Sequence, residues 1–170
     1  MKKLVSLCLF ILVGFSAISQ KYAIIDTRYI LDKMPEYGAA EKRIEQVSQQ
    51  WQKEIDEKQT QLDRMYKNFE AEKFILPPDL LKKREDELFF LEKEIRDLQK
   101  KRFGYEGDLF KERQKLVKPI QDKVYNAVQK MAVSRGYDFI LDKSEGITVI
   151  FADPKLDKSD EILKSMGIKL

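Results

Sequence analysis

The chain has 170 residues, with 32 Lys or Arg against 29 Asp or Glu, one Cys and no His. This length suggests one domain, or one domain with an extension. Without histidine, and with a single cysteine close to the N-terminus, the commonest catalytic bases, nucleophiles and soft metal ligands are missing. The sequence also has no P-loop and no glycine-rich dinucleotide motif. We therefore expect no enzymatic activity, no cofactor and no bound metal.

Residues 1–19 have the layout of a secretory signal peptide. Two lysines precede an apolar run from Leu4 to Phe15, and Ala17-Ile18-Ser19 provides small residues for cleavage. We expect cleavage near Ser19, because the apolar run is shorter than the roughly 20 residues that an uncleaved spanning helix needs. Cys8 would leave with the signal, and the remaining 30 basic and 29 acidic residues would nearly cancel. A chain with so little net charge attracts nucleic acid weakly, so no nucleic-acid partner is expected.

The segment after the signal predicts one short strand and then two long helices. The strand is expected over Tyr22–Ile25. Apolar residues at three- and four-residue spacing, from Ile44 to Phe69, predict a long helix that Pro77 and Pro78 end. A second helix is expected from Asp79 to Arg135. Together they predict an antiparallel hairpin, a coiled-coil arm over residues 39–117 with its turn at 75–79, in which the numbers of facing residues sum to about 155.

Three residues interrupt the pattern of the second helix. Gly104 and Gly107 each cost roughly 1 kcal/mol relative to Ala inside a helix, and Pro119 removes one hydrogen bond of the ladder. We interpret all three as candidate hinges and expect a kink at Pro119, where the arm joins the body. Trp51 is expected to face Gly104, and this glycine either makes room for the indole or lets the arm bend.

The C-terminal part predicts a small body made of residues 20–38 and 118–170. Strands are expected over Tyr137–Leu141, after a helix that ends at Gly136, and over 147–152. Ser159 is expected to cap a last helix that stops at Gly167. Three strands on so small a body leave open edges, which a symmetric oligomer would cover. The candidate oligomerisation residues are Ile24, Tyr137, Phe139, Leu141, Val149 and Phe151.

The stretch FILPPDLL at the hairpin turn is apolar where a soluble protein ought to face water. Large apolar patches on soluble proteins commonly mark interaction sites. The candidate binding residues are those of the turn and four aromatic residues away from the helix seam: Phe74, Ile75, Leu76, Leu80, Leu81, Phe89, Phe90, Phe103 and Phe110. Packing between the helices is the alternative for each of them. Residues 101–135 also hold nine basic against four acidic residues, among them Lys111, Arg113, Lys115 and Lys118.

The order of these features resembles the Skp/OmpH family of periplasmic chaperones over nearly all of the mature chain. The most specific part is the ending from Ala132 to Leu163, with GYDFILD, then GITVIFA, then DEIL. The resemblance implies an α+β, mainly α fold: a homotrimer with a small β-barrel-like body, from which helical arms project around a cavity. It further implies an ATP-independent periplasmic holdase whose partners are unfolded outer-membrane β-barrel proteins. The apolar residues above would contact these clients, and the four basic residues would line the cavity.

The mature chain departs from this family in its charge. Familiar members are strongly basic, whereas residues 61–100 hold nine basic and ten acidic side chains here. We therefore expect only weak contact between the arm tips and a membrane surface. The alternative function is that of a non-chaperone coiled-coil scaffold protein of the cell envelope. A scaffold would have fixed partners and would not suppress aggregation.

Overall fold

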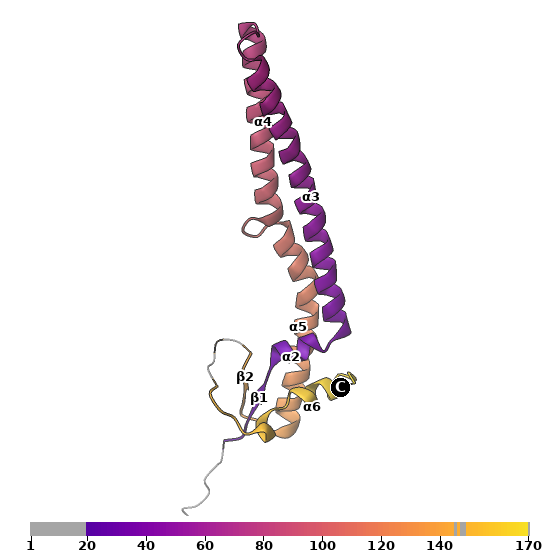
Figure 1. Ribbon diagram of the computed structural model, residues 1–170. Helices are drawn as coiled ribbons and strands as arrows, with labels where there is room; N and C mark the ends of the chain where they lie inside the picture. Colours follow the sequence, from indigo (N-terminus) through magenta and orange to yellow (C-terminus); the bar gives the residue numbers. More distant parts are fainter. Residues whose placement is uncertain (1–19, 145, 147–148, 170) are drawn as a thin grey trace, which may run out of the picture. The chain divides into compact units, whose positions relative to one another are not determined.

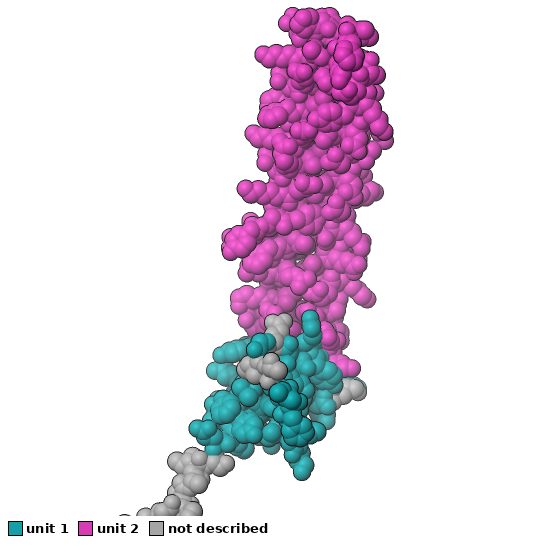
Figure 2. Space-filling model, turned by 60° about the vertical axis from the view of Figure 1, so that its left-hand side comes forward, with its two compact units in different colours: residues 1–30, 125–170 teal, residues 31–124 magenta. Residues whose placement is uncertain are grey.

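The computed structural model describes residues 20–144, 146 and 149–169 and is mainly helical. The elements, drawn in Figure 1, are β1 (Tyr22–Ile25), α2 (Thr27–Asp32), α3 (Pro35–Glu72), α4 (Pro78–Phe103), α5 (Asp108–Arg135), β2 (Phe139–Asp142), the 3-10 helix η1 (Pro154–Leu156) and α6 (Ser159–Ser165). They form two compact units. Unit 1 takes in residues 1–30 and 125–170, and unit 2 takes in residues 31–124 (Figure 2).

Unit 2 is a long antiparallel helical hairpin. In Figure 1, α3 runs beside α4, and the apolar seam between them buries Ile55, Leu62, Leu88, Leu91 and Ile95. Ion pairs across the hairpin join Lys58 to Glu94, Glu54 to Arg102, and Glu41 to Arg113. Their residue numbers sum to 152, 156 and 154. The predicted hairpin and its register near 155 are therefore confirmed.

The hairpin turn takes in residues 73–77, and the proline pair determines where α4 begins. The amide of Lys73 donates to the carbonyl of Phe69 at the end of α3, and Pro78 occupies the first turn of α4. A backbone amide at this position has no partner within the helix, so a proline here removes no hydrogen bond. At its other end α3 begins at Pro35, four residues before the predicted helix.

The prediction of one continuous helix from Asp79 to Arg135 is wrong. Helix α4 ends at Phe103 and α5 begins at Asp108, and the loop Gly104–Gly107 lies between them. Gly107 donates to the carbonyl of Gly104, and Glu106 has a φ of 52°. Glycine at both ends of this loop permits the tight turn, because a residue without Cβ tolerates close backbone contacts. By contrast, Pro119 lies inside α5 without ending it.

Trp51 packs against the side chain of Arg102. The Arg102 guanidinium lies 4.7 Å from the centre of the indole ring, in cation–π geometry. A Cβ built on Gly104 would first meet the backbone of Lys100. The indole is covered by a long, flat cationic side chain, and the expected position of Gly104 opposite Trp51 stays a prediction.

The sheet of unit 1 has two parallel strands. Tyr22 pairs with Phe139 and Ile25 with Asp142, and the whole hairpin lies between the strands in sequence. Helix α5 ends as predicted at Gly136, which has a φ of 65°, with the amide of Tyr137 donating to the carbonyl of Ala132. The strand that follows is confirmed, although it begins at Phe139 rather than at Tyr137.

The described residues of one chain form no barrel and no third strand. Of the predicted strand 147–152, residues 147 and 148 lie outside the described part, and 149–152 are not in a strand. An extended segment becomes a strand only by pairing, and 149–152 has no strand partner within the described chain. Among the described residues, the one further backbone pairing is an isolated parallel bridge between Ile24 and Asp157.

The predicted cap of the last helix is also wrong. Ser159 is the first residue of α6, and its amide and hydroxyl both donate to the carboxylate of Asp157. The Ser159 hydroxyl oxygen in turn accepts the Asp26 amide, so its side chain joins two segments inside unit 1. The end at Gly167 is confirmed by its φ of 78°. None of the helices in the described part of the chain is both long and apolar enough to cross a membrane.

Candidate functional site

The hairpin turn presents apolar side chains to water. Phe74 is 87% exposed and Ile75 81%, while Leu80 is half exposed and Leu76 and Leu81 are partly buried. Within the turn, the amide of Ile75 donates to the carbonyl of Glu72. The ammonium of Lys73 lies 5.1 Å from the ring centre of Phe74. The tip is thus an apolar surface with a cation beside it.

A second apolar surface lies further along α4. Phe89 and Phe90 are both exposed, and their rings meet edge to face with 5.9 Å between centroids. They lie between the buried Leu88 and Leu91 in sequence and point away from the seam that these two leucines fill. Offset and edge-to-face aromatic pairs present both ring faces and ring edges to a partner.

A third group surrounds the break between α4 and α5. Phe103 and Phe110 are partly exposed, and Tyr105 between them is 96% exposed. The candidate residues predicted from the sequence do not include Tyr105, because an unbroken helix was expected there. The signal that could have found it is an aromatic residue between two glycines three positions apart.

The four candidate basic residues do not all offer free charge. Arg113 pairs with Glu41 at 3.4 Å, and Lys118 pairs with Asp122 one turn further along α5 at 3.1 Å. Lys111 and Lys115 are exposed and form no ion pair within the described residues. Of the four candidates, Lys111 and Lys115 are therefore the two without an ion pair in the described part of the chain.

The candidate oligomerisation residues differ in their surroundings. Ile24 is only 4% exposed in a single chain, so it belongs to the core of unit 1. Phe139 stacks on Tyr22 with 5.6 Å between ring centres, and both rings remain partly exposed. Tyr137, Leu141 and Val149 are partly buried, whereas Phe151 is 85% exposed. Their role between copies stays a prediction, as does that of Gly104, Gly107 and Pro119 as hinges.

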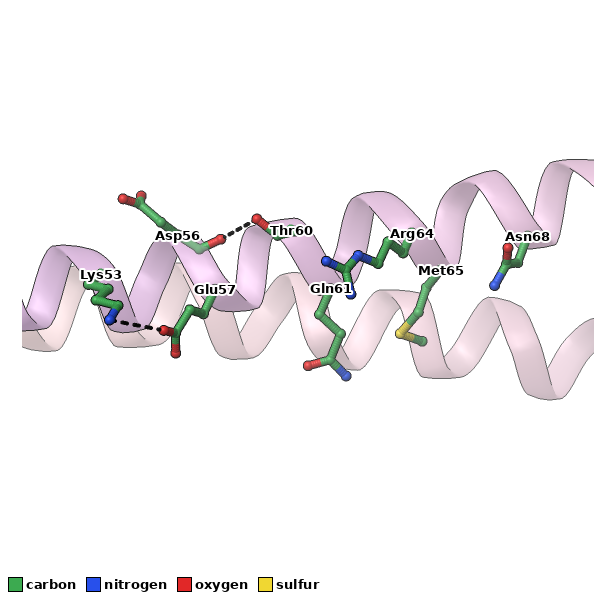
Figure 3. A pocket seen from close by; sticks show the side chains of 8 residues that line it. All are labelled: Lys53, Asp56, Glu57, Thr60, Gln61, Arg64, Met65 and Asn68. Carbon is green, nitrogen blue, oxygen red and sulfur yellow. Dashed lines mark hydrogen bonds and ion pairs between the residues drawn. The ribbon is translucent and has the colours of Figure 1, made fainter.

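A shallow groove of about 610 Å³ runs along α3 (Figure 3). Its side chains are mostly polar and pair along the same helix: Lys53 with Glu57 at 3.9 Å, and the Thr60 hydroxyl with the carbonyl of Asp56. These are ordinary contacts between helix positions four apart. In the described part of the chain, no three Asp, Glu, Cys or His residues are grouped so that they could hold a metal ion.

The chain belongs to the OmpH-like family: the family model described as outer membrane protein (OmpH-like) matches residues 21–166. No curated protein matches the chain. Among solved structures, the chain is similar to the crystal structure of a proposed outer membrane chaperone (OmpH-like) from Caulobacter crescentus CB15. The two are 18% identical with a TM-score of 0.70, and the match covers 86% of this chain and 83% of the other. At this identity the likeness concerns the fold.

Proposed function

We propose that this protein is an ATP-independent holdase chaperone of the periplasm, which binds unfolded outer-membrane β-barrel proteins and prevents their aggregation. The observation that carries this proposal is the set of exposed apolar side chains along the arm of an OmpH-like chain. Phe74, Ile75, Phe89 and Phe90 face water on a hairpin whose seam is already filled by other residues. Exposed apolar patches on soluble proteins mark surfaces that bind a partner.

The proposed binding is multivalent, with each contact weak. The apolar residues are dispersed from the tip to the region of Phe110, so one extended client could touch several of them at once. Linked weak contacts raise the effective concentration of the client at the next contact. Lys111 and Lys115 would attract acidic client segments and speed their capture at low ionic strength.

A homotrimer is part of the proposal, and the exposed residues of unit 1 support it. Phe139 and Phe151 leave apolar surface open on a small body whose sheet has two strands. Pairing of these segments between three copies would cover that surface and build the barrel-like body. Three arms would then enclose a common cavity for the client. Export with cleavage near Ser19 would deliver this assembly to the periplasm.

Suppression of aggregation tests the proposed function. A urea-denatured outer-membrane β-barrel protein is diluted into buffer with and without the mature chain, and light scattering is followed. We expect scattering to fall to near baseline at one assembly per client, without added ATP. Bovine serum albumin at equal mass is the control for crowding. Unchanged scattering would contradict the proposal and favour a scaffold protein of the envelope.

A further inference from the structure

The loop Gly104–Gly107 is a small projection from an otherwise regular hairpin. Figure 1 shows it as a turn that leaves the line of α4 and α5. Its one aromatic side chain is Tyr105, which is 96% exposed and forms no side-chain hydrogen bond with the described residues. An unbroken helix would have placed residue 105 along the arm without any loss of helical hydrogen bonds. The break therefore exposes a tyrosine at a cost to the backbone.

That cost is visible in the backbone of the loop. Glu106 has a φ of 52°, a conformation that residues other than glycine seldom adopt. A Cβ on Gly104 would lie 2.3 Å from the carbonyl oxygen of Lys100, and one on Gly107 would lie 2.8 Å from that of Lys101. Strained backbone persists where the surroundings hold it, and it concentrates at functional sites.

The contacts that hold this loop in place are made by the side chain of Arg102. Its Nη1 donates to the Asp108 carboxylate at 2.7 Å, which joins the last turn of α4 to the first residue of α5 across the base of the loop. Its Nη2 donates to Glu54 of α3 at 3.2 Å, and the guanidinium lies over Trp51. The side chain is only 21% exposed. The loop is thus clamped at its base, while its tip is free.

The charges beside the loop indicate what would bind there. Lys100 and Lys101 precede it and Lys111 follows it, and all three are exposed without an ion pair in the part of the chain that the structure describes. Asp108, which follows the loop, is engaged by Arg102, and Glu106 is the one carboxylate within the loop itself. An exposed aromatic ring with unpaired lysines before and after it in the sequence is complementary to a polypeptide segment that carries both aromatic and acidic side chains.

We propose that the loop Gly104–Gly107 is a client-contact site in which Tyr105 stacks on aromatic side chains of an unfolded polypeptide, while Lys100, Lys101 and Lys111 pair with carboxylates next to them. This inference rests on the proposed function and adds a residue and a preference to it. The preference is for extended segments in which aromatic and acidic residues are neighbours.

The test compares variants that differ at the ring alone. A fluorescently labelled, urea-denatured outer-membrane β-barrel protein is titrated with the full mature chain, and anisotropy gives the Kd. Tyr105→Ser is expected to weaken binding about threefold to tenfold, the worth of one aromatic contact. Tyr105→Phe, the matched control, keeps the ring and should stay within about twofold of wild type. Circular dichroism confirms that both variants are folded.

A second arm tests the acidic preference. Two short unstructured peptides with the same aromatic residues, one containing Glu and the other Lys, are titrated with wild type and with a variant in which Lys100, Lys101 and Lys111 are all Gln. The Glu peptide should bind wild type more tightly, and the variant should lose this difference.

The outcomes separate this inference from the proposed function. If wild type binds the client and Tyr105→Ser binds it equally well, the inference is wrong and the chaperone proposal stands. If Tyr105→Ser instead changes the mass of the assembly in solution, the loop is a contact between copies and the inference is again wrong. If wild type binds no unfolded client, both proposals fail.

Discussion

Arg102 connects three segments of unit 2 through one side chain. It pairs with Glu54 on α3 and Asp108 on α5, and its flat guanidinium covers Trp51. Its Nε is buried without a hydrogen-bond partner among the described residues, and the guanidinium makes its hydrogen bonds through the two terminal nitrogens. Buried charges are expensive unless they are paired, and here both ion pairs and an aromatic face offset the cost.

Removal of the Arg102 side chain should therefore destabilise the arm. We expect Arg102→Ala to lower the free energy of unfolding by about 1–3 kcal/mol, since partly buried carboxylates lose their partner and the indole loses its cover. The free energy of unfolding of Arg102→Lys should lie between those of wild type and Arg102→Ala, because lysine keeps the charge but not the planar guanidinium. The measurement is urea unfolding followed by circular dichroism. Arg96→Ala, which breaks the exposed pair with Glu92, is the control and should cost less than about 0.5 kcal/mol. Equal costs at the two sites would contradict this account.

Asp142 stabilises the start of α2 from the end of β2. Its carboxylate accepts the Thr27 amide at 3.1 Å, the Thr27 hydroxyl at 2.5 Å and the Ser144 amide at 3.0 Å. Burial of the Asp142 carboxylate acts to raise its pKa, but the hydrogen bonds from Thr27 and Ser144 together outweigh burial and hold the pKa below its ordinary value. The folded state thus favours the charged carboxylate more than the unfolded state does.

This lowered pKa predicts a loss of stability in acid. Between the folded pKa and the ordinary value near 4, the unfolded chain binds more protons, so stability rises with pH in that range. The contribution of Asp142 is present above about pH 5 and is lost as the pH falls through the folded pKa. We expect Asp142→Asn to lower Tm at pH 7 and to show a smaller further fall toward pH 3 than wild type. Glu85→Gln, at an exposed site, should follow the wild-type slope; parallel curves for Asp142→Asn and wild type would contradict the prediction.

At the scale of elements, the break between α4 and α5 depends on glycine. A Cβ at Gly104 would collide with a backbone oxygen, whereas a Cβ at Gly38, inside α3, would meet nothing within 4 Å. We expect Gly104→Ala to destabilise unit 2 by about 1–3 kcal/mol through forced backbone movement. The same change at Gly38 should stabilise it by about 0.5–1 kcal/mol, because alanine is the better helix former. Thermal unfolding of the two variants decides this, and effects of the same sign would refute it.

The elements that spacing could predict are those whose burial repeats along the chain. Residues such as Ile55 and Leu91 recur at helical spacing because one face of each helix fills the seam, and the proline pair marks the turn. The break at Gly104–Gly107 was not predicted, because each glycine alone is tolerated within a helix. The helical spacing of apolar residues was therefore expected to continue through this segment. The short helix α2 has too few residues to show a period. The missing strand at 149–152 depends on a pairing partner, which local sequence does not specify.

The candidate site was predictable only where exposure follows from local chemistry. Phe74 and Ile75 had to face water once two prolines ended the helix beside them. Phe89 and Phe90 followed from their positions beside a seam residue. Tyr105 was missed because its exposure arises from the loop, and Arg102 was missed as a clamp because its partners Glu54 and Asp108 are brought together only by the fold.

At the scale of the whole molecule, the two units present exposed aromatic residues that we assign to different tasks. Phe151 of unit 1 is 85% exposed and has Ile150, also exposed, beside it, while Phe74 of unit 2 is 87% exposed at the arm tip. A contact between copies buries residues permanently, and a contact with a client must leave them free until the client arrives. If the proposed assignment is right, the two phenylalanines should be separable by substitution.

We therefore expect Phe151→Ser to change the mass of the assembly in solution, and Phe74→Ser to change client binding instead. Wild type should have the mass of three chains in solution, measured by light scattering coupled to gel filtration. Phe151→Ser should lower this mass, since each copy loses apolar area worth about 1.5–3 kcal/mol when buried. Phe74→Ser should keep the mass of three chains and weaken suppression of client aggregation. A variant at Phe74 that dissociates the assembly, or one at Phe151 that leaves it intact, would contradict the division of tasks, because the same exposed ring cannot be closed in an interface and open to a client.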